Sequence, residues 1–214
     1  MLKIKSFTLA IFFGVAAVGL PISSARAILT ELDLNTSGDK LITVDSVTGL
    51  QWLDITATQG QSYTESLSDP DVLAGGFRHA TRDEVATLFI NSGVADFSNT
   101  FQASNFLGAI DLQSKIGVTG FVLISGQPSR PVTQGFSDFD PFSNFTDVVR
   151  LVSRTDREFT ARALIENTPR PKTNKFDSYG NYYLRVAPVP EPASVLLFGV
   201  GLAGLAWIRR RRSR

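Results

Sequence analysis

The last 26 residues constrain the chain most, because they join an uncharged apolar run to a basic end. Residues 193–208 carry no charged side chain and are rich in Leu, Val, Gly and Ala. As a helix this run would be about 24 Å long, which is shorter than the ~30 Å hydrocarbon core of a bilayer. Arginines that reach the interface and local thinning of the bilayer make such a short span feasible. We therefore predict a single transmembrane helix at 193–208, outside the folded domain.

The flanks of the apolar run set its limits and its orientation. Four arginines follow it directly: Arg209, Arg210, Arg211 and Arg212. The positive-inside rule predicts that this Arg-rich tail, residues 209–214, stays in the cytoplasm. A short proline-rich linker, residues 187–192, precedes the run and contains Pro190, Glu191 and Pro192. Because proline lacks an amide donor and clashes with the preceding turn, the helix cannot extend upstream.

A Pro-Glu-Pro triplet, a short hydrophobic helix and a basic tail together resemble the PEP-CTERM sorting signal of exopolysaccharide-producing bacteria. The resemblance implies processing near Pro190-Glu191-Pro192 by a membrane enzyme of the exosortase type. The protein would then be anchored in the inner membrane before processing and reach the cell surface or the extracellular polysaccharide matrix afterwards. The alternative is an ordinary single-pass anchor with a stop-transfer signal, which has no need of Pro-Glu-Pro. The tail alone does not decide whether the helix is retained.

The N-terminus carries the features of a secretory signal peptide. Lys3 and Lys5 form a positive start, residues 7–20 are largely apolar, and an Ala-x-Ala cleavage site follows at Ala25 and Ala27. We predict a signal peptide at residues 1–27, removed by signal peptidase after Ala27. The alternative is a retained N-terminal membrane helix, for which the apolar run is short.

The body between the two signals is acidic. Residues 28–188 carry 13 Lys and Arg against 19 Asp and Glu, which argues against a nucleic-acid partner. The charge is also uneven: residues 28–149 hold 5 basic and 15 acidic side chains, whereas residues 150–188 hold 8 and 4. We expect these two parts to attract each other within the fold. With no cysteine in the chain, stability must come from the core alone.

The residues that usually carry catalysis are scarce. The chain has no cysteine and a single histidine, His79. It therefore lacks the set of thiolate and imidazole ligands of a soft-metal site, and it lacks the thiol that nucleophilic cysteine catalysis requires. No Gly-x-Ser-x-Gly motif and no glycine-rich phosphate loop is present. We therefore expect a non-enzymatic protein without metal or cofactor, and a structural or surface role for His79.

Extended segments and two helices predict an α+β domain with a mainly antiparallel sheet. Runs rich in β-formers predict strands at 41–44, 50–54, 120–125, 148–153 and 182–186. A loose helical pattern at 61–74 is broken by Pro70. Thr81 and Glu84 form a capping box for a helix that Gly93 can end. A second helix is predicted from Ser98, as N-cap, to Lys115. Its predicted buried face consists of Phe101, Phe106, Leu107 and Ile110.

Residues 43–54, 61–63 and 75–85 resemble the Lcl C-terminal-like family, a C-type-lectin-like module of exported bacterial proteins. The matching residues are Asp45, Thr48, Gly49, Leu50, Trp52, Phe77, Arg78, Thr81 and Glu84. The family's Leu-Pro is replaced by His79-Ala80. The resemblance implies a C-type-lectin-like domain over residues 28–186, closed by a strand at 184–186. Within it we expect Trp52 in the core, Asp45 bonded to the following turn and Arg78 paired with a carboxylate.

The segment 135–145 provides the candidate ligand site. Phenylalanines recur at every third position, but Pro141 and several polar residues favour a long loop over a helix. The candidate ligand residues are Asp138, Phe139, Asp140 and Asn144. Their oxygens suit Ca²⁺ and their aromatic ring can stack on sugar. The alternative is that the phenylalanines pack onto the core. The corresponding functions are a structural matrix protein or a carbohydrate-binding module acting on the secreted polysaccharide.

Overall fold

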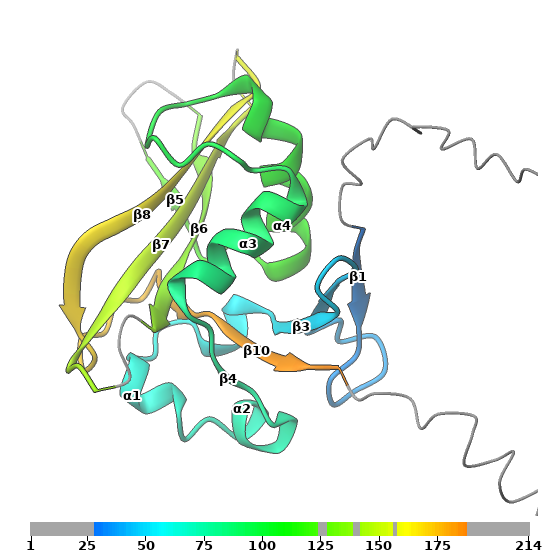
Figure 1. Cartoon of the computed structure of the whole chain (residues 1–214), viewed down its shortest axis with the longest axis vertical. Helices are drawn as coiled ribbons and strands as arrows, with labels where there is room; N and C mark the ends of the chain where they lie inside the picture. Colours follow the sequence, from blue (N-terminus) through cyan, green and yellow to red (C-terminus); the bar gives the residue numbers. More distant parts are fainter. Residues whose placement is uncertain (1–27, 124–127, 139–141, 156–157, 188–214) are drawn as a thin grey trace, which may run out of the picture.

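Two β-sheets and two main helices form the domain, and the ends of the domain meet in the first sheet (Figure 1). The computed structural model describes residues 28–123, 128–138, 142–155 and 158–187. Within these ranges, no helix has the length and apolarity needed to cross a membrane. The predicted signal peptide, transmembrane helix and cytoplasmic tail lie outside the described residues. Mixed helix with mainly antiparallel sheet confirms the α+β class.

The first sheet joins the start of the domain to its end. Its strands lie in the order β1 (Leu29–Leu32), β2 (Ile42–Asp45), β3 (Leu50–Leu53), β10 (Tyr183–Val186) and β4 (Arg78–His79). All neighbours are antiparallel, and the register sets Leu184 opposite Trp52. The last strand is therefore held on both sides, by β3 and by β4.

The second sheet is larger and also antiparallel. It runs in the order β5 (Gly120–Val122), β6 (Arg130–Asp138), β7 (Phe145–Arg154) and β8 (Thr160–Pro171). The short β9 (Gly180–Asn181) adds a parallel pairing with β6. Since β9 comes just before β10, the chain passes directly from the second sheet to the first.

The main helices are α3 (Arg82–Ser92) and α4 (Phe106–Ile116). The predicted capping box at α3 is confirmed: Thr81 and Glu84 bond each other's backbone amides, and Gly93 ends the helix with φ 98°. The segment around Pro70 forms two short helices, α1 (Tyr63–Ser66) and α2 (Pro70–Gly75), because proline occupies the first turn of α2. Two 3₁₀ turns, η1 (Ile55–Thr58) and η2 (Ala103–Asn105), complete the elements.

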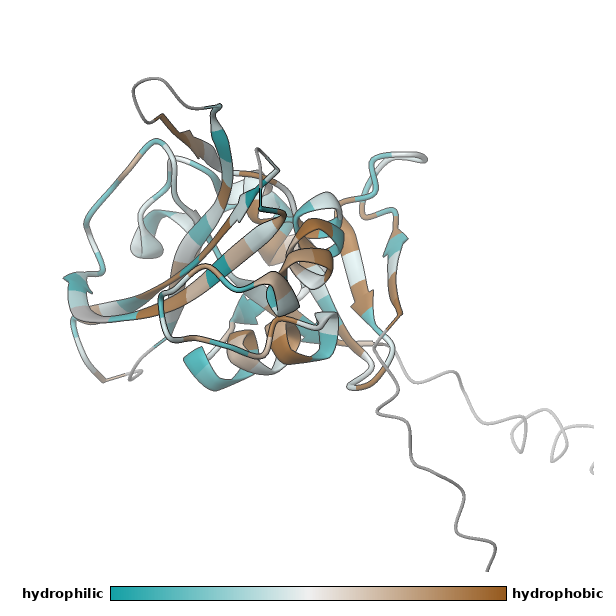
Figure 2. Ribbon diagram, turned by 90° about the horizontal axis from the view of Figure 1, so that it is seen from above, coloured by the Kyte–Doolittle hydropathy of each residue, from teal (hydrophilic) through white to brown (hydrophobic). Residues whose placement is uncertain are grey.

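The main core lies where the two helices meet both sheets. It combines Trp52 and Leu184 from the first sheet with Val149 and Leu151 from the second, and with side chains of α3 and α4. Figure 2 shows hydrophobic residues concentrated on the helices and neighbouring strands, whereas the outer loops are largely hydrophilic. Trp52 is 2 % exposed, as predicted. The hydrophobic effect thus holds the two sheets to the same pair of helices.

The second predicted helix was placed too early and on the wrong face. Ser98 does not cap it: its amide bonds Asp96, and the helix begins only at Phe106. Leu107, predicted to be buried, is 68 % exposed, while Leu112 and Ile116 are buried. Gly108 explains the rotation, because it faces the backbone of Ser92 and Gly93 where α3 ends. A close approach of two backbones needs a residue without Cβ.

The prediction of a long loop at 135–145 is also largely wrong. Residues 135–138 complete β6 and Phe145 begins β7, so the connection is a hairpin between two long strands. Phe136 is buried, whereas Phe142 is 96 % exposed and Phe145 44 % exposed, so only Phe136 of these three packs inside. Strand β8 was not predicted, because Pro169 and Pro171 argue against a strand. Its position at the sheet edge explains their presence, since an edge strand can lack amide donors.

Replacing Gly108 with alanine should destabilise the protein. A Cβ at this position would lie 2.6 Å from Ser92 O and from Gly93 C. We expect a loss of about 1–3 kcal/mol in the free energy of unfolding, although alanine is intrinsically a better helix former by about 1 kcal/mol. Leu107→Ala, at the exposed neighbour, is the control and should change stability by less than about 1 kcal/mol. Denaturant unfolding measures both; a Gly108→Ala variant as stable as wild type would contradict the packing.

Candidate functional site

The described candidate ligand residues lie at the β6–β7 hairpin. Asp138 ends β6 and is half-buried, and Asn144 is exposed; Phe139 and Asp140 lie outside the described residues. Lys172 links the two that are described. Its Nζ is 3.5 Å from Asp138 Oδ1, and its amide donates to Asn144 O at 2.9 Å. Asp138 thus already has a cationic partner, which reduces its value as a Ca²⁺ ligand.

Asp138 also borders a polar cavity of about 320 Å³ at the start of α3. Its other lining residues are Thr81, Arg82 and Asp83. The wall is fixed by the backbone, since Asp138 N donates to Ala80 O at 2.7 Å. Arg82, which also lines the cavity, has its Nη1 atom 3.8 Å from Oδ2 of the buried Asp147. Burial raises the pKa of Asp147, and Arg82 partly offsets that rise.

A stack of rings lies beneath Lys172. The Tyr63 and His79 rings are nearly parallel with centroids 3.6 Å apart, and Tyr183 follows at 4.0 Å from His79. Lys172 Nζ lies 4.5 Å from the Tyr63 ring centroid, within cation–π range. Burial and the neighbouring Asp138 raise the pKa of Tyr63. The stack therefore joins α1, β4 and β10 beneath one half-buried cation.

A hydrogen-bonded chain runs through the same stack. Tyr183 Oη lies 2.7 Å from His79 Nε2 and 2.9 Å from Ser66 Oγ. Serine, tyrosine and histidine in this order suggest a proton relay, but Ser66 and Tyr183 are fully buried and His79 is only 7 % exposed. A substrate has no access to these atoms. Desolvation, followed by repulsion from Lys172, lowers the pKa of His79 to about 3, so the ring is neutral. This series of hydrogen bonds thus links α1 to the first sheet.

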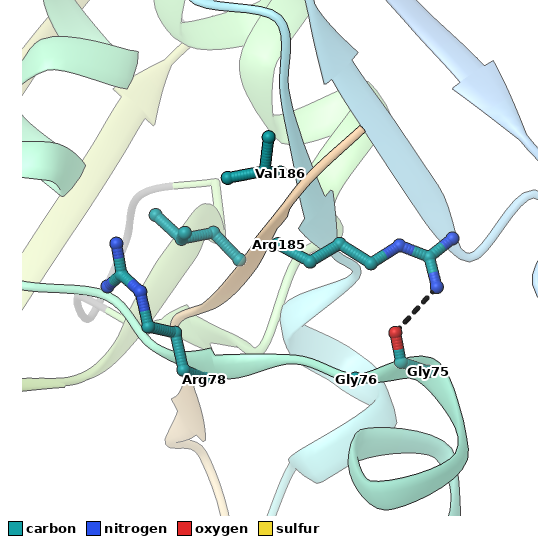
Figure 3. A pocket seen from close by; sticks show the side chains of 6 residues that line it. Gly75, Gly76, Arg78, Arg185 and Val186 are labelled. Carbon is teal, nitrogen blue, oxygen red and sulfur yellow. Dashed lines mark hydrogen bonds between the residues drawn. The ribbon is translucent and has the colours of Figure 1, made fainter. Parts of the chain in front are cut away.

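A shallow groove of about 490 Å³ lies beside the last strand (Figure 3). It is lined by Gly75, Gly76, Arg78, Leu184, Arg185 and Val186. Its two arginines extend in opposite directions from β4 and β10, as Figure 3 shows.

Both groove arginines are held by neighbours. Arg185 donates to Gly75 O and Gln51 Oε1, each at 2.7 Å, and its guanidinium lies 4.6 Å from the Phe77 ring centroid. Arg78 makes a bidentate pair with Glu84 at 2.6 and 2.9 Å, which confirms its predicted carboxylate partner. These arginines shape the end of the domain from which the sorting segment continues.

Asp45 plays the predicted part in the turn after β2. Its carboxylate accepts from Val47 N at 2.9 Å and from Thr48 Oγ1 at 2.8 Å. Asn91 Nδ2 donates to it as well, at 2.7 Å, so the same carboxylate fastens the turn to α3. The motif residues Asp45, Trp52 and Arg78 therefore all support the fold.

Sequence reasoning missed the partners that surround Asp138. Tyr63 was assigned to a loose helix, and Lys172 lies 34 positions beyond Asp138 in a segment with no recognisable pattern. No local signal could place that lysine, because its position depends on the return of β8. Within the described part of the chain, no group of three or more His, Asp or Glu residues is arranged to hold a metal ion.

Comparison with known proteins identifies the tail. Residues 188–212 match the family model of the PEP-CTERM protein-sorting motif. The match implies an exported protein that is processed by exosortase, a membrane enzyme, and sorted to the cell surface. No curated protein and no solved structure matches the chain. The sorting residues Ala25, Ala27, Pro190–Pro192 and Arg209–Arg212 lie outside the described residues.

The buried histidine predicts a specific dependence of stability on pH. The pKa of His79 is about 3 when folded and 6.5 when exposed, so between these values the unfolded state binds the proton. His79 therefore stabilises the fold fully above pH 6.5 and less as the pH falls. Between pH 7.5 and 5.0 the wild type should lose roughly 2 kcal/mol more than His79→Gln. Urea titrations at both pH values test this, with Tyr183→Phe, which keeps the histidine, as control. An equal loss in wild type and His79→Gln would contradict it.

Proposed function

We propose that this chain is a non-enzymatic protein of the cell surface or exopolysaccharide matrix, released from the inner membrane by exosortase. The observation that carries the proposal is the PEP-CTERM motif at residues 188–212, which begins two residues after the last strand of the domain. The interior position of the Ser66–Tyr183–His79 chain supports a non-catalytic role. The two arginines of the groove beside β10 also bind partners within the fold: Arg185 donates to Gly75 O, and Arg78 pairs with Glu84.

The way the domain ends suits cleavage of the tail. β10 is bonded to β3 and to β4, so the domain does not depend on residues beyond Val186 for its last strand. The linker, residues 187–192, can span at most about 20 Å when fully extended. Before processing, the first sheet would therefore stay close to the membrane surface. After processing, the complete sheet would leave with the domain.

We propose that the domain has a C-type-lectin-like fold. The matched motif occurs on β3 and at the β4–α3 step, and the predicted closing strand, β10, pairs with β3. Arg78 and Glu84 of the motif join β4 to α3, and Asp45 joins the β2 turn to the same helix. The shared residues are thus those that connect the terminal strands to the first main helix. This assignment supports a binding or structural module.

Removal of both signals should be visible in the mass of the mature protein. Protein recovered from wild-type cells should begin at Ile28 and lack the segment 193–214, whereas a strain without exosortase should retain that segment. Replacing Pro190 and Pro192 by alanine should block C-terminal removal, because these residues belong to the Pro-Glu-Pro triplet. Pro188→Ala, in the same linker but outside the triplet, is the matched control. A mature wild-type protein with an intact tail would refute the processing.

A second candidate function is binding of neutral sugars at the β6–β7 hairpin. The observation that favours it is Phe142, which is 96 % exposed and lies two positions before Asn144 in the sequence. An exposed aromatic ring offers a face on which a sugar can stack.

A glycan array tests this second function. Wild type should bind a neutral polysaccharide, and Phe142→Ala, Phe139→Ala and Asp140→Ala should each weaken binding by about tenfold, because a stacking or hydrogen-bonding group is lost. Phe159→Ala, which removes another exposed phenylalanine, is the control. Ca²⁺ and EDTA should give equal binding, since Lys172 already pairs with Asp138. Unchanged binding in all three hairpin variants would exclude the hairpin as the site.

A further inference from the structure

Two segments of the chain have the form Asn-x-Ser/Thr, in which the middle residue is not proline. They are residues 35–37, Asn-Thr-Ser, and residues 144–146, Asn-Phe-Thr. This acceptor tripeptide is the sequence to which N-linked glycans are attached in exported proteins. The PEP-CTERM motif implies that this chain is exported. Because such tripeptides also occur by chance, their accessibility in the structure decides which of them can be used.

The acceptor tripeptide at 144–146 is partly buried in the second sheet. Its third residue, Thr146, belongs to β7 and is fully buried. The Thr146 hydroxyl donates to Ser137 O on the neighbouring strand β6. Recognition of the tripeptide requires the hydroxyl at its third position. In the folded domain this hydroxyl is therefore occupied and out of reach of an enzyme.

The acceptor tripeptide at 35–37 is accessible over its whole length. It lies in the loop between β1 and β2, and Asn35, Thr36 and Ser37 are all exposed. Within the part of the chain that the structure describes, the Ser37 hydroxyl makes no hydrogen bond. The group that recognition requires is thus available at the surface.

The shape of this loop is set by Asp39, which lies outside the tripeptide. The Asp39 carboxylate accepts from the backbone amides of Thr36, Leu34 and Asn35 at 2.7, 2.9 and 2.9 Å. Backbone hydrogen bonds, those from Thr36 and Leu34 foremost, lower the pKa of Asp39 to about 2. These bonds use main-chain atoms of the tripeptide, so replacing the side chain of Thr36 or Ser37 leaves them in place.

The side-chain amide of Asn35 is held at the surface. Its Nδ2 donates to Asp71 Oδ1, in the first turn of α2, at 2.6 Å. A primary amide carries two N–H groups, and this bond uses one of them. Attachment of a sugar replaces one N–H, so the other can still donate to Asp71. A glycan on Asn35 is therefore compatible with the folded loop.

The residues that precede the two tripeptides also differ. Asp33, which is exposed, lies two positions before Asn35, whereas Phe142 holds the corresponding position before Asn144. A carboxylate at this position offers an ionic contact to an enzyme whose peptide site is basic. Accessibility and charge therefore both favour Asn35.

We propose that Asn35 is the acceptor of an N-linked glycan. The donor is an oligosaccharide carried on a polyprenyl diphosphate, on the side of the inner membrane to which the chain is exported. Transfer forms a bond between Asn35 Nδ2 and C1 of the first sugar, and breaks the bond between that carbon and the diphosphate oxygen. The amide proton passes to a base of the transferase and polyprenyl diphosphate leaves, so no group is oxidised or reduced. The inference rests on export, which is part of the proposed function.

Peptide mass spectrometry of the protein recovered from its own cells tests the proposal. Trypsin cleaves after Lys40 and after Arg150, so the two acceptor tripeptides fall in different peptides. In wild type the peptide that ends at Lys40 should carry a glycan, and fragmentation should place it on Asn35. The peptide that contains Asn144 should have its unmodified mass.

Substitutions within the loop separate recognition from folding. Ser37→Ala should abolish the modification, because it removes the required hydroxyl, whereas Ser37→Thr should retain it. Asn35→Gln should also abolish it, which distinguishes an N-linked glycan from a sugar on a hydroxyl. Thr36→Ala, which removes a hydroxyl one residue earlier, is the matched control and should retain the glycan. Thermal unfolding of each variant confirms that it folds.

Several results would overturn the proposal. These are an unmodified Asn35 in protein whose signal peptide has been removed, a glycan on Asn144 in its place, and a glycan that persists in Ser37→Ala or in Asn35→Gln. Equal loss of the glycan in Thr36→Ala and Ser37→Ala would also contradict it. The masses of the first and last peptides report export and C-terminal processing separately. Normal export and processing with an unmodified Asn35 would refute the glycan site alone and leave the sorting function intact.

Discussion

Strand β10 lies between β3 and β4 and pairs with both of them. This pairing brings the last strand of the domain next to one of its first, and sets Leu184 opposite Trp52 in the core shared by both sheets. Its neighbour Tyr183 reaches His79 and Ser66, which fixes α1 against the same sheet. The strand ends at Val186, which pairs with Leu50 of β3. The sorting signal thus follows a domain whose last strand is already paired with other strands of the domain.

Local signals in the sequence predicted local structure well. The capping box of Thr81 and Glu84 fixes the start of α3, and the Asp45 turn and the Arg78 pair form as expected, because each involves residues close in sequence. The α4 face was mispredicted because it is set by contact between Gly108 and the end of α3, and not by the apolar pattern of α4 itself. Strand β8 was missed because proline is acceptable only at the edge position that the whole sheet gives it.

In the candidate site, too, some features could be predicted from the sequence and others depend on the whole fold. Asp138 was recognised as a polar residue of interest, but its half-burial and its pairing with Lys172 change its chemistry from metal ligand to ion-pair partner. The uneven charge of the chain was visible in the sequence and predicted internal attraction. In the structure, Lys172 and Lys175 of the basic part pair with Asp138 and Glu65 of the acidic part, whereas Arg154 and Arg162 lie, with Arg130, around Phe101. Only the pairing of the strands could reveal the second group.

We propose that the domain folds as a complete module and is delivered beyond the membrane once its tail has been removed. Fractionation of cells, followed by detection of the folded domain in each fraction, tests this claim most directly. We expect the domain to be found at the cell surface or in the extracellular matrix, and to accumulate in the inner-membrane fraction when exosortase is absent. A domain that stays in the inner-membrane fraction of wild-type cells would contradict it.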